Sequence, residues 1–104
     1  MTANLHIHLF GPFAIELDGQ SLTNQDWYTQ QTQTIGKILF ARSGKVVTSE
    51  QLIELVWPHE PIEAARRSLH VRISQLRKVL QDKKSLVRTL HGGYLFEPDL
   101  SCWI

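Results

Sequence analysis

The longest uninterrupted periodic pattern in the chain runs from Pro61 to Gln81, with no glycine or further proline inside it. Apolar residues recur there at every third or fourth position, which predicts a helix with a buried stripe of Ile62, Ala65, Leu69, Ile73, Leu76 and Leu80. The opposite face is expected to collect Ala64, Arg67, Ser68, Val71, Ser74, Gln75 and Lys78, with Arg66, His70, Arg72 and Arg77 along its flanks.

The chemistry of that outer face suits the major groove of DNA. Arginines contact phosphates, Gln and Ser hydrogen-bond to base edges, and Val71 can pack against a thymine methyl group. A solvated basic surface helix is the competing interpretation of this segment alone. The other segments therefore have to decide between the two.

Alternating patterns at the start of the chain predict a small antiparallel sheet over residues 1–24. Leu5–Phe10 and Phe13–Leu17 each alternate apolar and polar residues, and a turn at Asp18–Gly19 leads to a third short strand. His6 and His8 share one face of the first strand. With no third ligand nearby in the sequence, this pair favours solvent-facing or cross-strand histidines over a metal site.

Two shorter helices are predicted between this sheet and the long helix. Trp27 and Tyr28 are expected to anchor the start of a helix over residues 29–42. Thr48, with a glutamine three residues later, has the spacing of a capping box, which predicts a helix over residues 49–57.

A glycine-tipped hairpin is predicted directly after the long helix, over residues 86–97. It has the position of a wing, and Arg88 and His91 near its tip can meet the DNA backbone or the minor groove. The short connection at residues 57–61 joins the two preceding helices into a helix-turn-helix. The expected fold class is therefore α+β, a winged helix-turn-helix with an N-terminal antiparallel β-sheet, a three-helix core over residues 27–81 and a C-terminal β-hairpin wing.

The positive charge is concentrated on the long helix and the segment after it. Residues 63–88 hold eight basic and two acidic side chains, a net charge of +6, whereas residues 1–62 hold three basic and six acidic ones, a net charge of −3. Such an asymmetry is the footprint expected for a polyanionic partner, although the whole chain carries only +1.

The ordered set of motifs resembles the winged-helix DNA-binding domain of the OmpR type, and most closely the version that opens antibiotic regulatory proteins of the SARP kind. The matching stretches are L-F-G-P-F-A-I, V-V-T-S-E-Q-L-I-E-L-V-W-P, A-A-R-R-S-L-H-V-R-I-S-Q-L-R-K-V-L and L-V-R-T-L-H-G-G-Y-L-F, which cover nearly the whole chain in order. The resemblance implies a four-stranded N-terminal sheet, three helices, a C-terminal hairpin and a bacterial transcription regulator that binds double-stranded DNA.

The resemblance also implies roles for individual residues. Arg67, Arg72 and Arg77 match phosphate- or base-contacting positions, Val71 matches a position that packs against bases, and Ser68, Ser74 and Gln75 match positions facing the groove. Members of the family often have basic residues where this chain has Ser74 and Gln75. Because Gln prefers adenine and Arg prefers guanine, the target sequence does not carry over.

Further partners follow from the resemblance. The loop at 57–61, with His59 and Glu60, is a candidate contact for RNA polymerase, and a second copy is expected on repeated half-sites. A chain of 104 residues suits one domain, here expected to be the N-terminal part of a longer regulator. The competing function is a winged-helix module that docks on an acidic protein partner.

Other function classes receive little support from the sequence. No catalytic triad, phosphate-binding loop or metal-ligand cluster stands out, so neither an enzyme nor a cofactor is expected. A single cysteine, Cys102, and the lack of a signal peptide or an apolar membrane span favour a cytoplasmic location.

Overall fold

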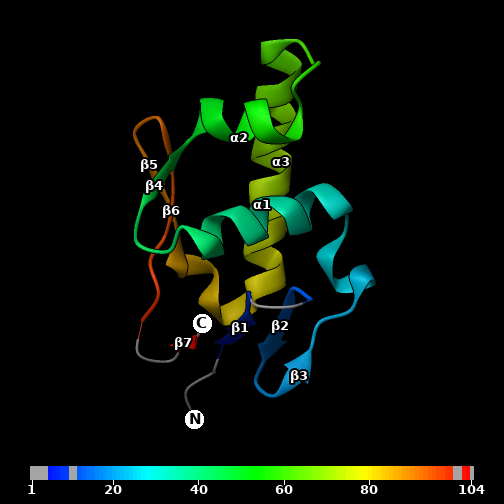
Figure 1. Cartoon of the computed structure of the whole chain (residues 1–104), viewed down its shortest axis with the longest axis vertical. Coiled ribbons are helices and arrows are strands. Elements are labelled where there is room, and N and C mark those ends of the chain that lie inside the picture. Colours follow the sequence, from blue (N-terminus) through cyan, green and yellow to red (C-terminus); the bar gives the residue numbers. More distant parts are fainter. Residues whose placement is uncertain (1–4, 10–11, 100–101, 104) are drawn as a thin grey trace.

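The computed structural model describes residues 5–9, 12–99 and 102–103, which form three helices and two small sheets (Figure 1). Helix α1 spans Gln30–Ala41, α2 spans Ser49–Val56 and α3 spans Ile62–Leu80, and 3-10 turns cover Asn24–Trp27 and Gln81–Leu86. The three helices lie within one residue of their predicted ends, and the predicted winged helix-turn-helix is confirmed. No described helix is long and apolar enough to cross a membrane.

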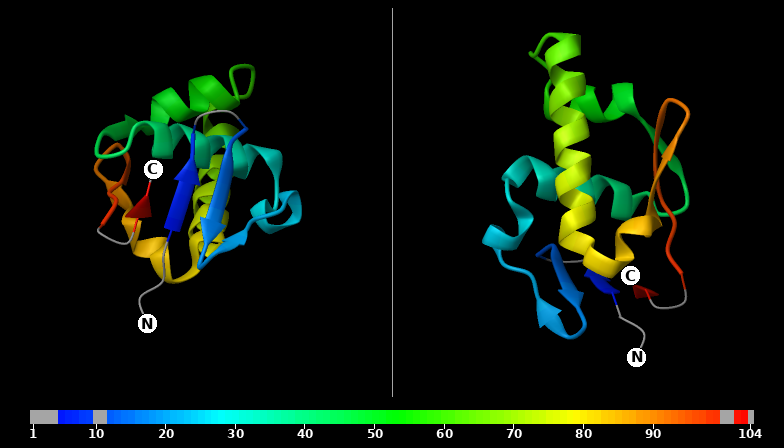
Figure 2. Two further views of the ribbon diagram at one scale, coloured as in Figure 1. Left: turned by 60° about the horizontal axis from the view of Figure 1, so that its bottom comes forward. Right: turned by 180° about the vertical axis from the view of Figure 1, so that it is seen from behind.

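The first sheet has four strands in the order β3-β2-β1-β7. Strands β1 (Leu5–His8), β2 (Ala14–Leu17) and β3 (Gln20–Ser21) are antiparallel, as the alternating pattern predicted. Strand β7 (Cys102–Trp103) comes from the far end of the sequence and runs parallel to β1 (Figure 2, left). The prediction from residues 1–24 was therefore incomplete. Phe10, the expected end of the first strand, lies outside the described residues.

The second sheet contains the wing and one additional strand. Strands β5 (Val87–Leu90) and β6 (Gly93–Phe96) form the predicted hairpin, and β4 (Val46–Thr48) pairs with the other edge of β6. The backbone N–H of Ser49, the first residue of α2, donates to the carbonyl of Gly92 at 3.0 Å. The turn of the wing is thus held by the start of α2.

Helix α3 supplies one long side of the core. Ala65, Leu69, Ile73, Leu76 and Leu80 are all buried, as the periodicity predicted. Ile62 is 48% exposed, which corrects its assignment to the buried stripe. Ile62 is the first residue of α3, and the first turn of this helix projects beyond α1 and α2 (Figure 1).

Helix α1 packs closely against the 3-10 turn before it and against α3. Trp27 is buried and lies against Gly36, where an added Cβ atom would be 3.0 Å from the Trp27 ring and 3.1 Å from Leu76. Tyr28, expected to share this anchoring role, is 54% exposed. Its φ of +68° turns the chain between the 3-10 turn and α1, which directs the side chain outward.

A glycine is required at position 93 because the backbones of β4 and β6 are close there. An added Cβ atom would lie 2.5 Å from the carbonyl oxygen of Val47. We expect Gly93→Ala to lower the free energy of unfolding by about 3 kcal/mol, measured by urea denaturation. Gly92→Ala is the matched control, since it meets no atom within 4 Å but has φ of +82° and should cost only about 1 kcal/mol. Equal losses would contradict the steric explanation.

Candidate nucleic-acid interface

The exposed side of α3 presents four side chains in one line along the helix. Arg67, Val71, Ser74 and Lys78 follow one another at spacings of four, three and four residues, so they share one face. All four are exposed, and Val71 leaves 49% of its surface accessible. The view from behind shows α3 in front, with the wing beside it (Figure 2, right). We call this line the outer strip of α3.

Gln75 and Arg72 lie on the side of α3 that faces α1. The Thr32 hydroxyl, on α1, donates to Gln75 Oε1 at 2.8 Å, and Arg72 Nη1 donates to the same oxygen at 2.8 Å. Both α3 side chains are half-buried, and Arg72 Nε is buried without a hydrogen-bond partner in the described part of the chain. The acceptor oxygen of Gln75 is thus already used inside the protein, and the expected contact of Gln75 with a base stays a prediction. Ser68, on the same flank, is half-buried as well.

Arg77 connects α3 to the wing. Its Nε and Nη2 donate to the carbonyl oxygen of Val87 at 3.1 and 3.0 Å, and Nη2 also donates to the Thr89 hydroxyl at 2.7 Å. A guanidinium used in this way fixes the position of β5 relative to the helix. Arg77 therefore positions the wing against α3, and its expected direct contact with DNA stays a prediction.

A groove of about 690 Å³ lies between α3 and the wing. Its lining residues are His70, Ile73, Ser74, Arg77, Lys78, Gln81, Lys84, Thr89 and Tyr94. Burial raises the pKa of the Tyr94 phenol, and the nearby charge of Arg77 opposes that rise. The groove is open and basic, and it joins the outer strip of α3 to the wing.

Lys84 is a site residue that the sequence interpretation did not select. Its neighbour Lys83 is buried, and Lys83 Nζ lies 4.0 Å from Asp99 Oδ2. Of these two adjacent lysines, only Lys84 lines the groove. The net charge of residues 63–88 was the available signal, but charge counting does not separate the two lysines. Their orientations depend on the 3-10 turn at Gln81–Leu86.

The two wing residues differ in their surroundings. Arg88 Nη1 donates to Glu97 Oε2 at 3.0 Å, and its backbone pairs with Leu95 rather than with the turn. Arg88 is therefore not at the tip, which corrects its expected placement. His91 is exposed in the turn of the hairpin, where the sequence placed it.

Three cations on α3 are exposed and available to a partner. Arg66, Arg67 and Lys78 make no ion pair or side-chain hydrogen bond with any residue that the structure describes. Unpaired cations attract a polyanion without first breaking internal bonds. These three side chains thus differ from Arg72 and Arg77, which form hydrogen bonds inside the protein.

A candidate set of metal ligands lies away from this surface, among the residues that the structure describes. His6, His8 and Glu16 lie together on the N-terminal sheet. The sequence argument that the histidine pair has no third ligand nearby is therefore wrong, because Glu16 faces the pair from the neighbouring strand.

Comparisons with known proteins agree with the geometry. The family described as "Transcriptional regulatory protein, C terminal" matches residues 27–96. The chain is 25% identical over 104 residues to "Regulatory protein DnrI" of Streptomyces peucetius, covering 91% of this chain and 37% of that protein. It is 28% identical over 78 residues to "Transcriptional regulatory protein MoaR1" of Mycobacterium tuberculosis, covering 75% and 24%.

A solved structure shows the same fold. Mycobacterium tuberculosis EmbR in complex with a low affinity phosphopeptide matches with a TM-score of 0.75 and 25% identity, over 96% of this chain and 26% of that chain. The chain therefore spans well under half the length of each of these three proteins.

Arg77→Ala should destabilise the fold, because the Val87 carbonyl and the Thr89 hydroxyl lose their shared donor. We expect the free energy of unfolding to fall by about 1–3 kcal/mol in urea denaturation. Lys78→Ala is the matched control, since this neighbouring cation is exposed and unbonded and should change stability by less than about 0.5 kcal/mol. Indistinguishable losses in the two variants would remove Arg77 from its positioning role.

Proposed function

The chain belongs to the family described as "Transcriptional regulatory protein, C terminal", and from this premise we propose that it binds specific double-stranded DNA sequences. This is a family of DNA-binding domains of transcription regulators and not a family of enzymes, and the predicted resemblance to SARP-type regulators is confirmed. In the proposed complex, α3 lies in the major groove and the wing lies along the backbone or minor groove.

The observation that carries the proposal is the outer strip of α3. Its side chains are exposed, it combines two unpaired cations with a hydroxyl and a methyl-bearing group, and the basic groove continues it toward the wing. A helix of this width fits the major groove, where such groups can contact phosphates and base edges at once.

Positions on α3 suggest a division of roles. Arg67, Val71 and Ser74 lie in the middle of the exposed face, and we assign them to base edges. The set assigned to phosphates comprises Arg66, Lys78 and Lys84, with His70 at the groove and His91 at the wing turn. Gln75, Arg72 and Arg77 then act indirectly, by fixing the orientation of α3 and the wing.

The remaining partners are proposals of the same kind. A single module of this size buries roughly 600–1,000 Å² on DNA, so a second copy on a repeated half-site would supply additional affinity. His59 and Glu60 in the loop between α2 and α3 are exposed and could meet RNA polymerase. We propose that the chain forms the DNA-binding part of a longer regulator, since it covers 37% and 24% of its two curated relatives.

The direct test is selection of binding sites for the 104-residue chain from a random duplex DNA pool at about 0.15 M salt. A sharp motif, or a direct repeat of it at about one helical turn, would support sequence-specific binding. A flat pool with measurable affinity would reduce the proposal to nonspecific attraction. Absence of binding, together with tight capture by an acidic protein, would favour the docking alternative.

Lys78→Ala should weaken binding equally on all DNA sequences, because a phosphate contact carries no sequence information. We expect the slope of log K against log salt to become shallower by about 0.9. Arg42→Ala is the matched control, since this exposed cation at the end of α1 does not line the groove. An unchanged slope for Lys78→Ala would remove this residue from the phosphate contacts.

Ser74→Ala should instead change the choice of base. The loss of one hydroxyl on the outer strip is expected to reduce discrimination at a single base pair by about 1 kcal/mol, with the salt slope unchanged. The measurement is a competition assay with single-substitution variants of the selected site. A uniform loss over all sites would place Ser74 outside direct base contact.

A further inference from the structure

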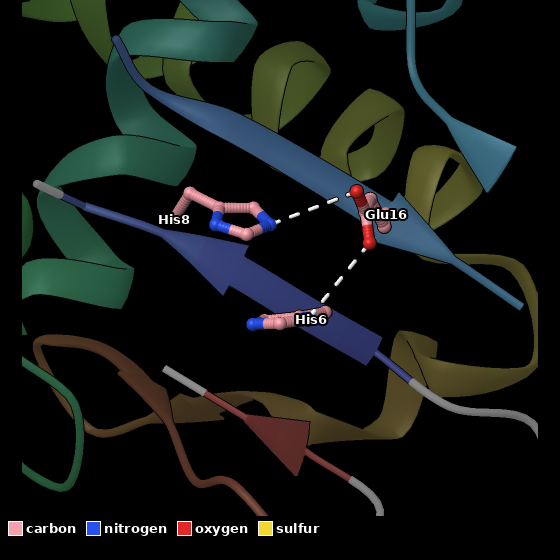
Figure 3. Close-up of side chains that lie close together, drawn as sticks. All are labelled: His6, His8 and Glu16. Carbon is pink, nitrogen blue, oxygen red and sulfur yellow. Dashed lines mark ion pairs between the residues drawn. The ribbon is translucent and has the colours of Figure 1, made fainter. Parts of the chain in front are cut away.

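We propose that His6, His8 and Glu16 form a binding site for a transition-metal dication such as Zn²⁺, on the outer face of the N-terminal sheet (Figure 3). The proposal does not rest on the DNA-binding function, because these residues lie on a different element from α3 and the wing. His6 and His8 are not part of the proposed DNA-binding surface.

Strand geometry brings the three side chains together. His6 and His8 are two residues apart on β1, so both point to the same face of the sheet. Glu16 is the direct antiparallel partner of His6 on β2 and points to that face too. The alternate residues of both strands, such as Ile7 and Ile15, are buried on the core side.

The distances are close to those of a bound ion. His6 Nδ1 lies 3.8 Å from Glu16 Oε2, and His8 Nε2 lies 3.7 Å from Glu16 Oε1. One ligand atom from each residue falls within 4.8 Å of the other two. Ligands about 2.0–2.2 Å from a tetrahedral zinc ion are separated by roughly 3.3–3.6 Å. Small rotamer changes of exposed side chains can therefore bring the three atoms around one ion.

The donor set selects the class of metal. Two imidazole nitrogens and one carboxylate oxygen suit Zn²⁺, Ni²⁺ or Cu²⁺ better than Mg²⁺ or Ca²⁺, which prefer oxygen ligands throughout. Side-chain exposures of 46% for His6, 40% for His8 and 37% for Glu16 leave room for water in the remaining positions. An open, three-ligand surface site of this kind should release its ion to a chelator.

The two imidazole rings of the proposed site lie face to face. Their centroids are 4.2 Å apart with an angle of 27° between the planes, so the rings are stacked. Rotation about the side-chain torsions is therefore needed before a nitrogen of each ring points at one ion, and the exposure of both rings permits it.

The expected physical effect is a cross-link between β1 and β2. A metal that binds the folded sheet and not the unfolded chain raises the melting temperature by mass action. For a domain of this size, zinc at tenfold over its Kd should raise Tm by about 5–10 °C, and EDTA should reverse the rise.

The test uses the untagged 104-residue chain, titrated with zinc by calorimetry and followed by thermal unfolding. We expect one zinc ion per chain, at least tenfold weaker binding in His8→Gln and in Glu16→Gln, and loss of the Tm shift in both. His59→Gln is the matched control, since this exposed histidine lies in the loop between α2 and α3. Unchanged zinc affinity in His8→Gln and Glu16→Gln, or no binding to the unmodified chain at millimolar zinc, would overturn the proposal.

A second measurement needs no variant and so does not depend on correct folding of one. In the unmodified chain, zinc should shift the NMR signals of the His6 and His8 imidazoles, and leave those of His59 unchanged. Shifts confined to other histidines would place the zinc elsewhere and overturn the assignment.

Discussion

Burial of a single apolar stripe on α3 determines which side of this helix faces outward. Ala65, Leu69, Ile73 and Leu76 place one side of the helix in the common core, so the opposite side has to face outward. Gly36 allows α1 and α3 to pack closely, because a larger residue at this position would press on Trp27 and Leu76. The outer strip is therefore a consequence of core packing as much as of its own chemistry.

Polar contacts on the two flanks then fix the rotation and the neighbours of α3. On one flank, Gln75 accepts from Thr32 of α1, and on the other, Arg77 donates to Val87 of the wing. A neutral hydrogen bond such as that of Thr32 contributes about 0.5–1.5 kcal/mol, and the bonds of a charged group such as Arg77 are stronger. Considered on the helix alone, Gln75 and Arg77 have the chemistry of DNA contacts. In the folded domain they also hold α3 and the wing in position for the exposed side chains of the outer strip.

Local features were the predictable part of this fold. The capping box of Thr48 and Gln51 is present in both directions, and the periodicity of α3 located its buried side almost completely. The pairing of the first two strands was predicted, but the register that places Glu16 opposite His6 was not. Contacts between segments far apart in the sequence, such as Arg77 against the wing and β7 beside β1, were not predictable from a single sequence either. The outward direction of Tyr28 likewise depends on a positive φ angle, which its residue type does not predict.

The pairing of β1 with β7 has a consequence for the order in which the chain folds. Leu5 pairs with Cys102, so this contact closes a loop of almost the whole sequence, whereas β5 and β6 are joined by a tight turn. Loop closure costs more entropy as the separation grows, and contacts between distant segments form more slowly than local ones. The hairpin and the helices should therefore form early, and the outer edge of the N-terminal sheet should be completed last.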